Sequence, residues 1–314
     1  MKEEILYLQN QEIDRVKWDQ CIEESPNGLI YAYTDYLDAL ADNWDALILN
    51  DYEAVMPLPW RKKWGFKYLY QPYFAATLGI FGEDISRARS ELFINFIPKK
   101  FSFWDLDLNE NVKGITAEKI KKTSRKNLLI YLNSPYEIIR NSYSRLANRM
   151  IKKSSNELVL KNDTAPENII KYYQYHYKYK HLLPSNAYEN LLKVAKLATT
   201  TGNIKAYTAE FKEGEIAAFY LLLFDSKFVY SVLGGSTEKG KKYGAFYLLT
   251  DAAIREFSGT NKSFRFEGSD KSGIAFFNAQ FGATLIEYLN IQKNDLPWPV
   301  SMIKNFKDKF IAFS

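Results

Sequence analysis

The sequence predicts an α+β protein made of two similar modules, each with a mixed central sheet flanked by helices. Its 314 residues are 46% hydrophobic and 16% aromatic, which is enough material for two cores. The second half reads as helix, strand, two helices, a three-strand meander, helix, strand, helix and strand, and the first half has a shorter version of this order. An Asn-Ser-Pro stretch at 133–135 separates them. We therefore expect domains over residues 1–133 and 134–296, with 297–314 as a candidate addition to the first.

Alternating apolar residues and turn signals define the first module. We expect two helices, a hairpin, a third strand, a helix and two more strands, over residues 14–24, 34–42, 46–49, 54–58, 66–70, 84–96, 101–108 and 128–132. Residues 109–126 are polar and lysine-rich, so we expect an exposed excursion there. The loop after the third strand holds Tyr73 in an aromatic cluster, which suits either a ligand wall or packing against a neighbouring domain.

Helical periodicity and three apolar runs define the second module. The predicted helices span residues 135–153, 166–181, 185–199 and 245–257, and the predicted strands span 156–160, 204–211, 215–224, 227–233, 263–267 and 281–291. The sequence KGKKYG at 239–244 is expected to be a basic loop. A short amphipathic helix is expected at 300–310.

Positive charge is concentrated in the middle of the chain, although the formal net charge is only +5. Residues 113–153 hold eleven basic residues against Glu118 and Glu137, a local net of +9. Arg149 and Lys152 fall on one stripe of the predicted helix. A phosphate-bearing small molecule, a tRNA acceptor arm or an anionic membrane surface would each suit this segment. The alternative is a solvated helix face whose charge is balanced elsewhere.

The cysteine and histidine content argues against disulfides and zinc-type sites. Cys21 is the single cysteine, and His176 and His181 are the two histidines, so we expect no metal. The amino terminus is too charged for a signal peptide, and the longest apolar run, 216–224, is too short to cross a bilayer. We expect a cytoplasmic protein without a transmembrane segment, for which peripheral membrane contact remains open.

The stretch FRFEGSDKSGIAFFNAQFG, residues 264–282, is the candidate catalytic element. It predicts a strand that ends at Glu267, a turn, and a short helix that carries Asn278. A carboxylate at a strand end beside a helix amino terminus is a common way to build a site, because free backbone amides attract anions there. The alternative is a carboxylate that only accepts hydrogen bonds from the turn amides.

Two longer stretches carry a resemblance to a known family. The sequences VLGGSTEKGKKYGAFYLLTDAAIREF and FRFEGSDKSGIAFFNAQFGA resemble the GNAT acyltransferase fold and, more narrowly, the tandem-GNAT Fem-like proteins. Residues 57–82 and 144–156 fit the same pattern, so the resemblance spans most of the chain. It implies two GNAT-like modules and either an acyl-CoA or an aminoacyl-tRNA donor.

The resemblance also implies roles for individual residues. Glu267 would act as the base and Asn278 would meet the oxyanion, while Arg149, Lys152, Tyr73 and Tyr230 would bind the acceptor substrate. The donor phosphates would be held by Gly234, Gly235, Ser236, Lys241, Lys242 and Gly244. Two departures matter: Phe246 would crowd the phosphate loop, and Asn278 stands where the Fem pattern has a functional lysine.

Three functions follow as hypotheses. The first is an acyltransferase that moves an acyl group from acetyl-CoA or another acyl-CoA to an amine or hydroxyl of a sugar, cell-wall or polysaccharide precursor. The second is an aminoacyl-tRNA-dependent transferase of peptidoglycan type, which the excess of basic charge favours. The third is a non-catalytic protein of the same fold that binds a glycan or nucleotide sugar.

Overall fold

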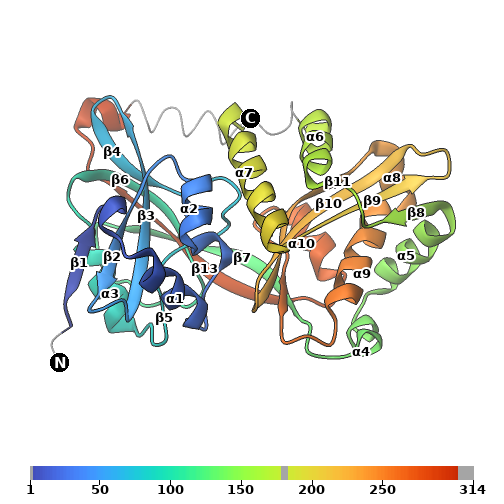
Figure 1. Ribbon diagram of the computed structural model, residues 1–314, viewed down its shortest axis with the longest axis horizontal. Helices are drawn as coiled ribbons and strands as arrows, with labels where there is room; N and C mark the ends of the chain where they lie inside the picture. Colours follow the sequence, from blue (N-terminus) through green and yellow to red (C-terminus); the bar gives the residue numbers. More distant parts are fainter. Residues whose placement is uncertain (1–2, 178–182, 303–314) are drawn as a thin grey trace. The chain divides into compact units, whose positions relative to one another are not determined.

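The computed structural model describes residues 3–177 and 183–302 and divides the chain into two compact units (Figure 1). Unit 1 comprises residues 1–125 and 288–314, and unit 2 comprises residues 126–287. The boundaries that we expected, 133/134 and 296/297, lie further along the chain than these. Two predictions concern the carboxyl-terminal end: that residues 297–314 complete the first domain, and that residues 300–310 form a helix. Both extend past residue 302, so they lie partly outside the described residues.

Unit 1 is a mixed sheet with helices. Its strands follow the order β1-β2-β3-β4-β6-β13, with β5 paired to β3, and β4 runs parallel to β6. The strands are β1 (Ile5–Leu8), β2 (Trp44–Leu49), β3 (Ala54–Lys63), β4 (Phe66–Tyr70), β5 (Phe81–Gly82), β6 (Phe101–Leu108) and β13 (Thr284–Asn294). The helices are α1 (Arg15–Glu24), α2 (Thr34–Leu40) and α3 (Arg87–Phe96), with short 3-10 turns at Asn10–Glu12 and Ile30–Ala32. Leu47, Met56, Phe93 and Trp104 belong to its core.

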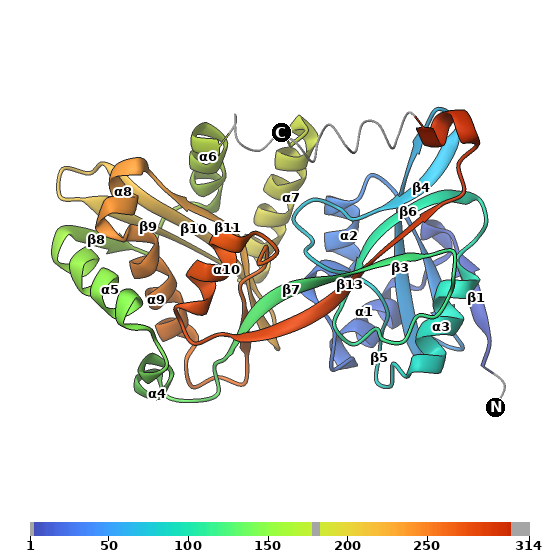
Figure 2. The same ribbon diagram turned by 180° about the vertical axis from the view of Figure 1, so that it is seen from behind.

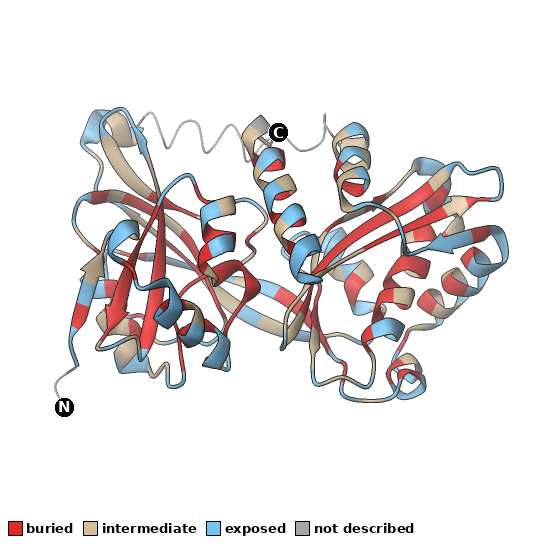
Figure 3. Ribbon diagram, in the orientation of Figure 1, coloured by how far each residue is buried: buried red, intermediate tan, exposed pale blue. Residues whose placement is uncertain are grey.

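Unit 2 has the sheet order β7-β12-β11-β10-β9-β8, in which only the β11–β12 pair is parallel. The strands are β7 (Lys121–Tyr131), β8 (Leu158–Lys161), β9 (Ile204–Phe211), β10 (Ile216–Phe224), β11 (Phe228–Ser236) and β12 (Ser263–Arg265). The helices are α4 (Tyr136–Asn141), α5 (Arg145–Glu157), α6 (Pro166–Tyr177), α7 (Ser185–Thr201), α8 (Glu238–Tyr243), α9 (Ala245–Phe257) and α10 (Ser272–Ala279). Buried residues line the sheet and the inner helix faces of each unit (Figure 3), so each unit has its own core.

Three predicted elements are wrong, each for a local reason. The single helix expected at 135–153 is two helices, because Ser144 caps a new helix by accepting a hydrogen bond from the Ala147 amide at 3.0 Å. The expected loop KGKKYG is the helix α8, which Thr237 caps through the Gly240 amide at 2.9 Å. The expected exposed excursion at 109–126 buries Val112 and Ile120 and contains the start of β7.

Two general expectations can be compared with the described residues. No helix within residues 3–177 and 183–302 is both long and apolar enough to cross a bilayer. The same residues contain no group of three or more His, Cys, Asp or Glu side chains arranged to hold a metal ion.

Candidate functional site

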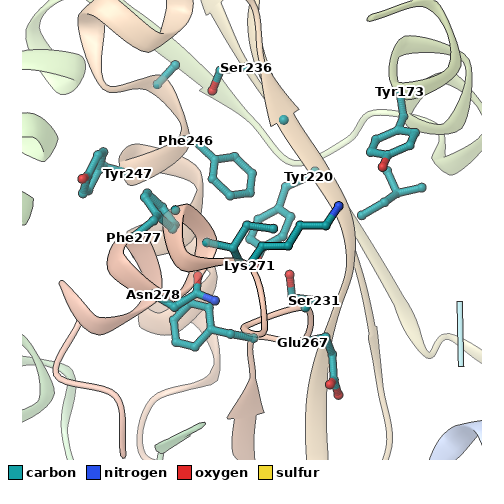
Figure 4. A pocket seen from close by; sticks show the side chains of 18 of the residues that line it. Tyr173, Tyr220, Ser231, Ser236, Phe246, Tyr247, Glu267, Lys271, Phe277 and Asn278 are labelled. Carbon is teal, nitrogen blue, oxygen red and sulfur yellow. The ribbon is translucent and has the colours of Figure 1, made fainter. Parts of the chain in front are cut away.

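A pocket of about 620 Å³ lies within unit 2, between the carboxyl-terminal half of β11, the start of α9 and the helix α10 (Figure 4). Its lining includes six consecutive residues of β11, from Ser231 to Ser236. Successive residues of a strand point to opposite faces of a sheet. A pocket lined by six in a row therefore borders the edge of the strand rather than one of its faces.

That edge of β11 lacks its neighbouring strand in the described structure. The parallel pairing with β12 covers Phe228 to Tyr230 and ends there, whereas the pairing with β10 on the other side continues to Ser236. The β10–β11 pairing also shifts register between Leu221 and Leu222, which is a bulge at the level of the pocket. An open strand edge offers backbone amides and carbonyls to an extended ligand.

The backbone after β12 explains why the edge is open. Glu267 and Gly268 both have positive φ, +53° and +66°, and these values turn the chain away from β11. The Asp270 carboxylate then accepts a hydrogen bond from the Lys126 amide at 2.8 Å and fixes the turn against β7. A non-glycine residue at positive φ is strained, and such strain is found preferentially at functional sites.

Aromatic rings build the wall opposite the strand edge. The ring of Phe246 lies 4.7 Å from Tyr220 and 5.3 Å from Phe277, and Tyr247 lies 4.7 Å from Phe277, between ring centroids. These contacts join β10, α9 and α10 into one stack. The pocket is therefore largely apolar, with charged and polar side chains at both ends: Lys241 on α8, and Lys271 and Asn278 at α10.

Burial raises the pKa of two phenols that line this pocket. The pKa of Tyr220 is raised by burial, against the smaller opposing effect of a hydrogen bond with Ser231. Burial, helped by the neighbouring phenols Tyr188 and Tyr177, raises the pKa of Tyr173 to about 12. These hydroxyls are neutral hydrogen-bonding groups at ordinary pH and do not act as bases.

Lys271 is the functional candidate that the sequence reasoning missed. It precedes α10, lines the pocket, and extends across it between Phe246 and Ser231 in Figure 4. An ammonium group among aromatic walls suits a carboxylate, a phosphate or a developing oxyanion. The signal in the sequence was its position in the turn that follows Glu267 and leads into the predicted helix.

Glu267 lies at the pocket, but its carboxylate is already engaged. One oxygen accepts from the Arg265 guanidinium at 3.1 Å and the other from the Asn127 amide at 2.7 Å. Arg265 is only 1% exposed, so it needs an anion beside it. Figure 4 shows the carboxylate directed away from Lys271 and Asn278. This arrangement favours a role in positioning the turn over the predicted role as a base.

Asn278 is buried on α10 and faces the same pocket. Its amide nitrogen donates to the Ser269 hydroxyl at 3.2 Å, and both side chains are almost inaccessible to solvent, at 3% and 2% exposed. This contact ties α10 to the turn after Glu267. Asn278 and Lys271 thus approach the pocket from the same short segment.

Five of the six predicted donor-binding residues line the pocket, namely Gly234, Gly235, Ser236, Lys241 and Gly244. The glycines have close neighbours: a Cβ on Gly234 would lie 2.6 Å from the Phe246 ring, and one on Gly235 would lie 2.5 Å from Tyr177. Phe246 therefore does crowd the strand at Gly234. Lys242, the sixth, is not among the lining residues, and its carbonyl accepts from the Lys153 ammonium at 2.7 Å.

The four predicted acceptor contacts do not come together at this pocket. Arg149 and Lys152 are exposed on α5 and are absent from its lining. Tyr73 belongs to unit 1 and is 38% exposed. Tyr230 is fully buried, donates its hydroxyl proton to the Asp225 carboxylate at 2.5 Å, and is absent from the lining of this pocket.

Comparison with solved structures identifies the fold of this chain. No protein-family model and no curated protein matches the sequence. Among solved structures, FemX superposes with a TM-score of 0.68 at 11% identity, covering 96% of this chain and 99% of its own. A C-terminal domain assigned to lysylphosphatidylglycerol synthetase from Agrobacterium fabrum gives 0.56 at 12% identity, covering 91% and 93%. A tandem GNAT protein from the clavulanic acid biosynthesis pathway gives 0.50 at 10% identity, covering 94% and 99%.

These similarities cover nearly the whole chain. They confirm the predicted α+β fold with two GNAT-like modules.

Proposed function

We propose that this chain, which has the tandem GNAT fold, is an acyltransferase whose donor binds in the pocket of unit 2. The observation that carries the proposal is the open edge of β11 from Ser231 to Ser236 beside an aromatic wall. Acyl-CoA is the donor that suits it best, because the pantetheine arm is an extended chain with two amide groups. Such an arm can pair with a strand edge as an added strand would.

The phosphates of the same donor would lie toward α8 and the start of α9. Lys241 borders the pocket there, where it forms an exposed ion pair with Glu238 at 2.6 Å. An exposed pair of this kind is weak, so a phosphate can compete for the lysine. Gly244 has φ of +76°, which lets the chain pass from α8 into α9 within one residue.

The reaction would take place at the other end, near α10. The nitrogen or oxygen of the acceptor attacks the thioester carbonyl, and negative charge develops on the carbonyl oxygen. Lys271 and Asn278 supply the donors for that oxyanion. The CoA thiolate then leaves and takes up the proton that the acceptor releases. Lys271 thus provides the positive charge that Asn278 cannot. We propose an amine or hydroxyl of a sugar or cell-wall precursor as the acceptor.

Calorimetric titration with acetyl-CoA tests the donor site. Wild type should bind, and Lys241→Glu should weaken binding by at least about tenfold, because a charge-assisted contact to phosphate becomes a repulsion. Lys239→Glu is the matched control: it lies on the same helix, changes the net charge equally and, like Lys241, forms an exposed ion pair, but it does not line the pocket. Absence of acetyl-CoA binding, or equal losses in both variants, would reject the donor site.

A second candidate is transfer from aminoacyl-tRNA. One solved structure of this fold is assigned to the synthesis of lysylphosphatidylglycerol, an aminoacyl ester, and α5 presents Arg145, Arg149 and Lys152 on its exposed face. This reading predicts tRNA binding that weakens steeply as salt rises and that Arg149→Glu reduces further. If the tRNA affinity does not change with salt concentration, this second candidate function is rejected. Tight binding of a glycan or nucleotide sugar without turnover would instead favour the non-catalytic hypothesis.

A further inference from the structure

The hairpin between β3 and β4 in unit 1 ends in an exposed tryptophan among lysines. The pairing of Lys63 with Phe66 leaves a two-residue turn, Trp64–Gly65. Trp64 is 56% exposed, and the Lys63 ammonium lies 5.1 Å from the centre of its ring. Large apolar side chains at a convex tip do not contribute to a core, so the position of Trp64 needs another explanation.

The geometry of the turn does not require tryptophan. Trp64 and Gly65 have φ values of +51° and +86°, the type I′ turn that favours Asn-Gly. A bulky residue is strained at positive φ, and asparagine would fit this position with less strain. The turn therefore holds tryptophan at a conformational cost.

The charge of this tip is positive and locally uncompensated. In the described part of the chain, Lys62, Lys63 and Lys67 form no ion pair with a carboxylate, whereas the neighbouring Arg61 is held by Asp42 at 2.7 Å. The Lys67 ammonium lies 3.8 Å from the centre of the Trp60 ring, a contact that leaves its charge in place. Three lysines thus lie within three residues of the exposed tryptophan in the chain.

A second exposed tryptophan lies at the same edge of unit 1. Lys67 at the start of β4 pairs with Phe101, and the adjacent Ser102 carbonyl accepts from the Asp295 amide at 2.8 Å at the end of β13. In Figures 1 and 2 the short helical segment after β13 lies beside the β3–β4 tip. That segment carries Trp298, 75% exposed, and Met302, 40% exposed.

We propose that this edge docks unit 1 onto an anionic lipid bilayer, with Trp64 and Trp298 at the headgroup level and the three lysines facing anionic headgroups. Tryptophan prefers the membrane interface because its ring is apolar while its N–H can stay hydrated. Lysines close to an anionic membrane each strengthen binding. The binding is peripheral and separate from the acyl-transfer proposal.

The same features fit a bilayer better than a nucleic acid. The tip is a projecting two-residue turn, and the cations there that form no ion pair within the described residues are lysines, which lack the bidentate fork that arginine offers to phosphates. A bilayer is a flat surface that a convex tip can enter. Single-stranded nucleic acids are bound in grooves that track the backbone.

Sedimentation of the full chain with vesicles tests the proposal. Vesicles of phosphatidylcholine with phosphatidylserine should bind the protein, vesicles of phosphatidylcholine alone should bind it much less, and added salt should weaken binding. Replacing Lys62 and Lys63 with Gln should weaken binding by about fivefold for each lysine. Trp64→Asn should abolish most of the binding while it keeps or raises the thermal midpoint, because asparagine suits the turn. A purely structural role for Trp64 would lower the midpoint instead.

Val16→Ser is the matched control. Val16 is 78% exposed on α1, whose amino-terminal cap Asp14 donates its amide proton to Tyr52 at 2.7 Å, next to the β2–β3 turn. That turn is at the opposite end of β3 from Trp64. Vesicle binding should equal that of wild type. The proposal is overturned if wild type ignores anionic vesicles, if Trp64→Asn binds as wild type does, or if the tip is needed for binding a single-stranded RNA but not vesicles.

Discussion

The ion pair between Arg265 and Glu267 links the fold of unit 2 to its pocket. Both side chains are nearly buried, at 1% and 11% exposed. Glu267→Ala removes the anion and should destabilise the protein by about 3 kcal/mol, as expected when a buried charge loses its partner. Glu267→Gln should lower the free energy of unfolding by less, because the amide oxygen of glutamine still accepts a hydrogen bond. Urea unfolding followed by circular dichroism measures both.

Activity distinguishes this positioning role from the base role. A base that becomes an amide loses nearly all turnover at unchanged stability, with the acidic limb of the pH–rate profile removed. A positioning residue should instead lose activity in proportion to stability and keep the shape of the profile. Wild-type stability in Glu267→Ala would contradict the positioning role.

Tyr173 supports a prediction about alkaline pH. Its pKa is raised from 10.0 to about 12 by burial, so between these values the unfolded chain loses the phenolic proton first. Stability is therefore full below about pH 10 and falls as the pH rises toward about 12. Tyr173→Phe should remove part of this loss, on the order of 1 kcal/mol. Urea midpoints across this range test it, with Tyr175→Phe, exposed on the same helix, as a control without effect.

Residue types predicted the site better than residue roles. The stretch 264–282 and the segment from Gly234 to Gly244 do meet at one pocket, because strand ends and helix starts are marked by glycine and polar residues. The orientation of the Glu267 side chain could not be predicted from the sequence. It is set by hydrogen bonds from the buried Arg265 and from Asn127, which lies 140 positions away in the chain. Lys271 was missed because a turn lysine is ordinarily solvated.

At the scale of elements, α8 is held tightly against β10. A Cβ on Gly240 would lie 1.9 Å from the Ala217 carbonyl oxygen, an atom that also accepts from the Thr237 amide at 2.9 Å. Gly240→Ala should therefore cost about 3 kcal/mol and weaken donor binding through the displaced Lys241. Gly273→Ala, on α10 with no neighbour within 4 Å, should be neutral or slightly stabilising. Thermal unfolding compares the two, and equal midpoints would contradict the close packing.

The same helix shows what sequence patterns miss. The two glycines and three lysines of KGKKYG predicted a loop, because glycine disfavours helices and no apolar stripe is present. The helix forms because its glycine faces a backbone carbonyl and Thr237 caps it. Long periodic segments such as 245–257 were predicted to the residue, since their apolar stripe faces the core.

At the scale of the whole molecule, the order of elements and the resemblance of residues 232–257 and 264–283 together predicted the tandem architecture. Two repeats of helices, a meander and a crossover leave few ways to bury their apolar faces. The limits of the units were harder to predict, because they fall inside the strands β7 and β13, each of which begins in one unit and ends in the other. The turn residues at 133–135 follow the end of β7, whereas the limit between the units lies a few residues earlier, inside that strand.

The two proposed surfaces belong to different units, and this leads to a final prediction. Trp64 and its lysines lie in unit 1, whereas Lys241 and Lys271 lie in unit 2. Substitutions that share no partner residues act additively. Trp64→Asn should therefore lose vesicle binding and keep the acetyl-CoA affinity of wild type, while Lys241→Glu should do the reverse. Calorimetry and sedimentation on both variants and on the double variant would measure this, and loss of both activities in either single variant would show that one surface serves both ligands.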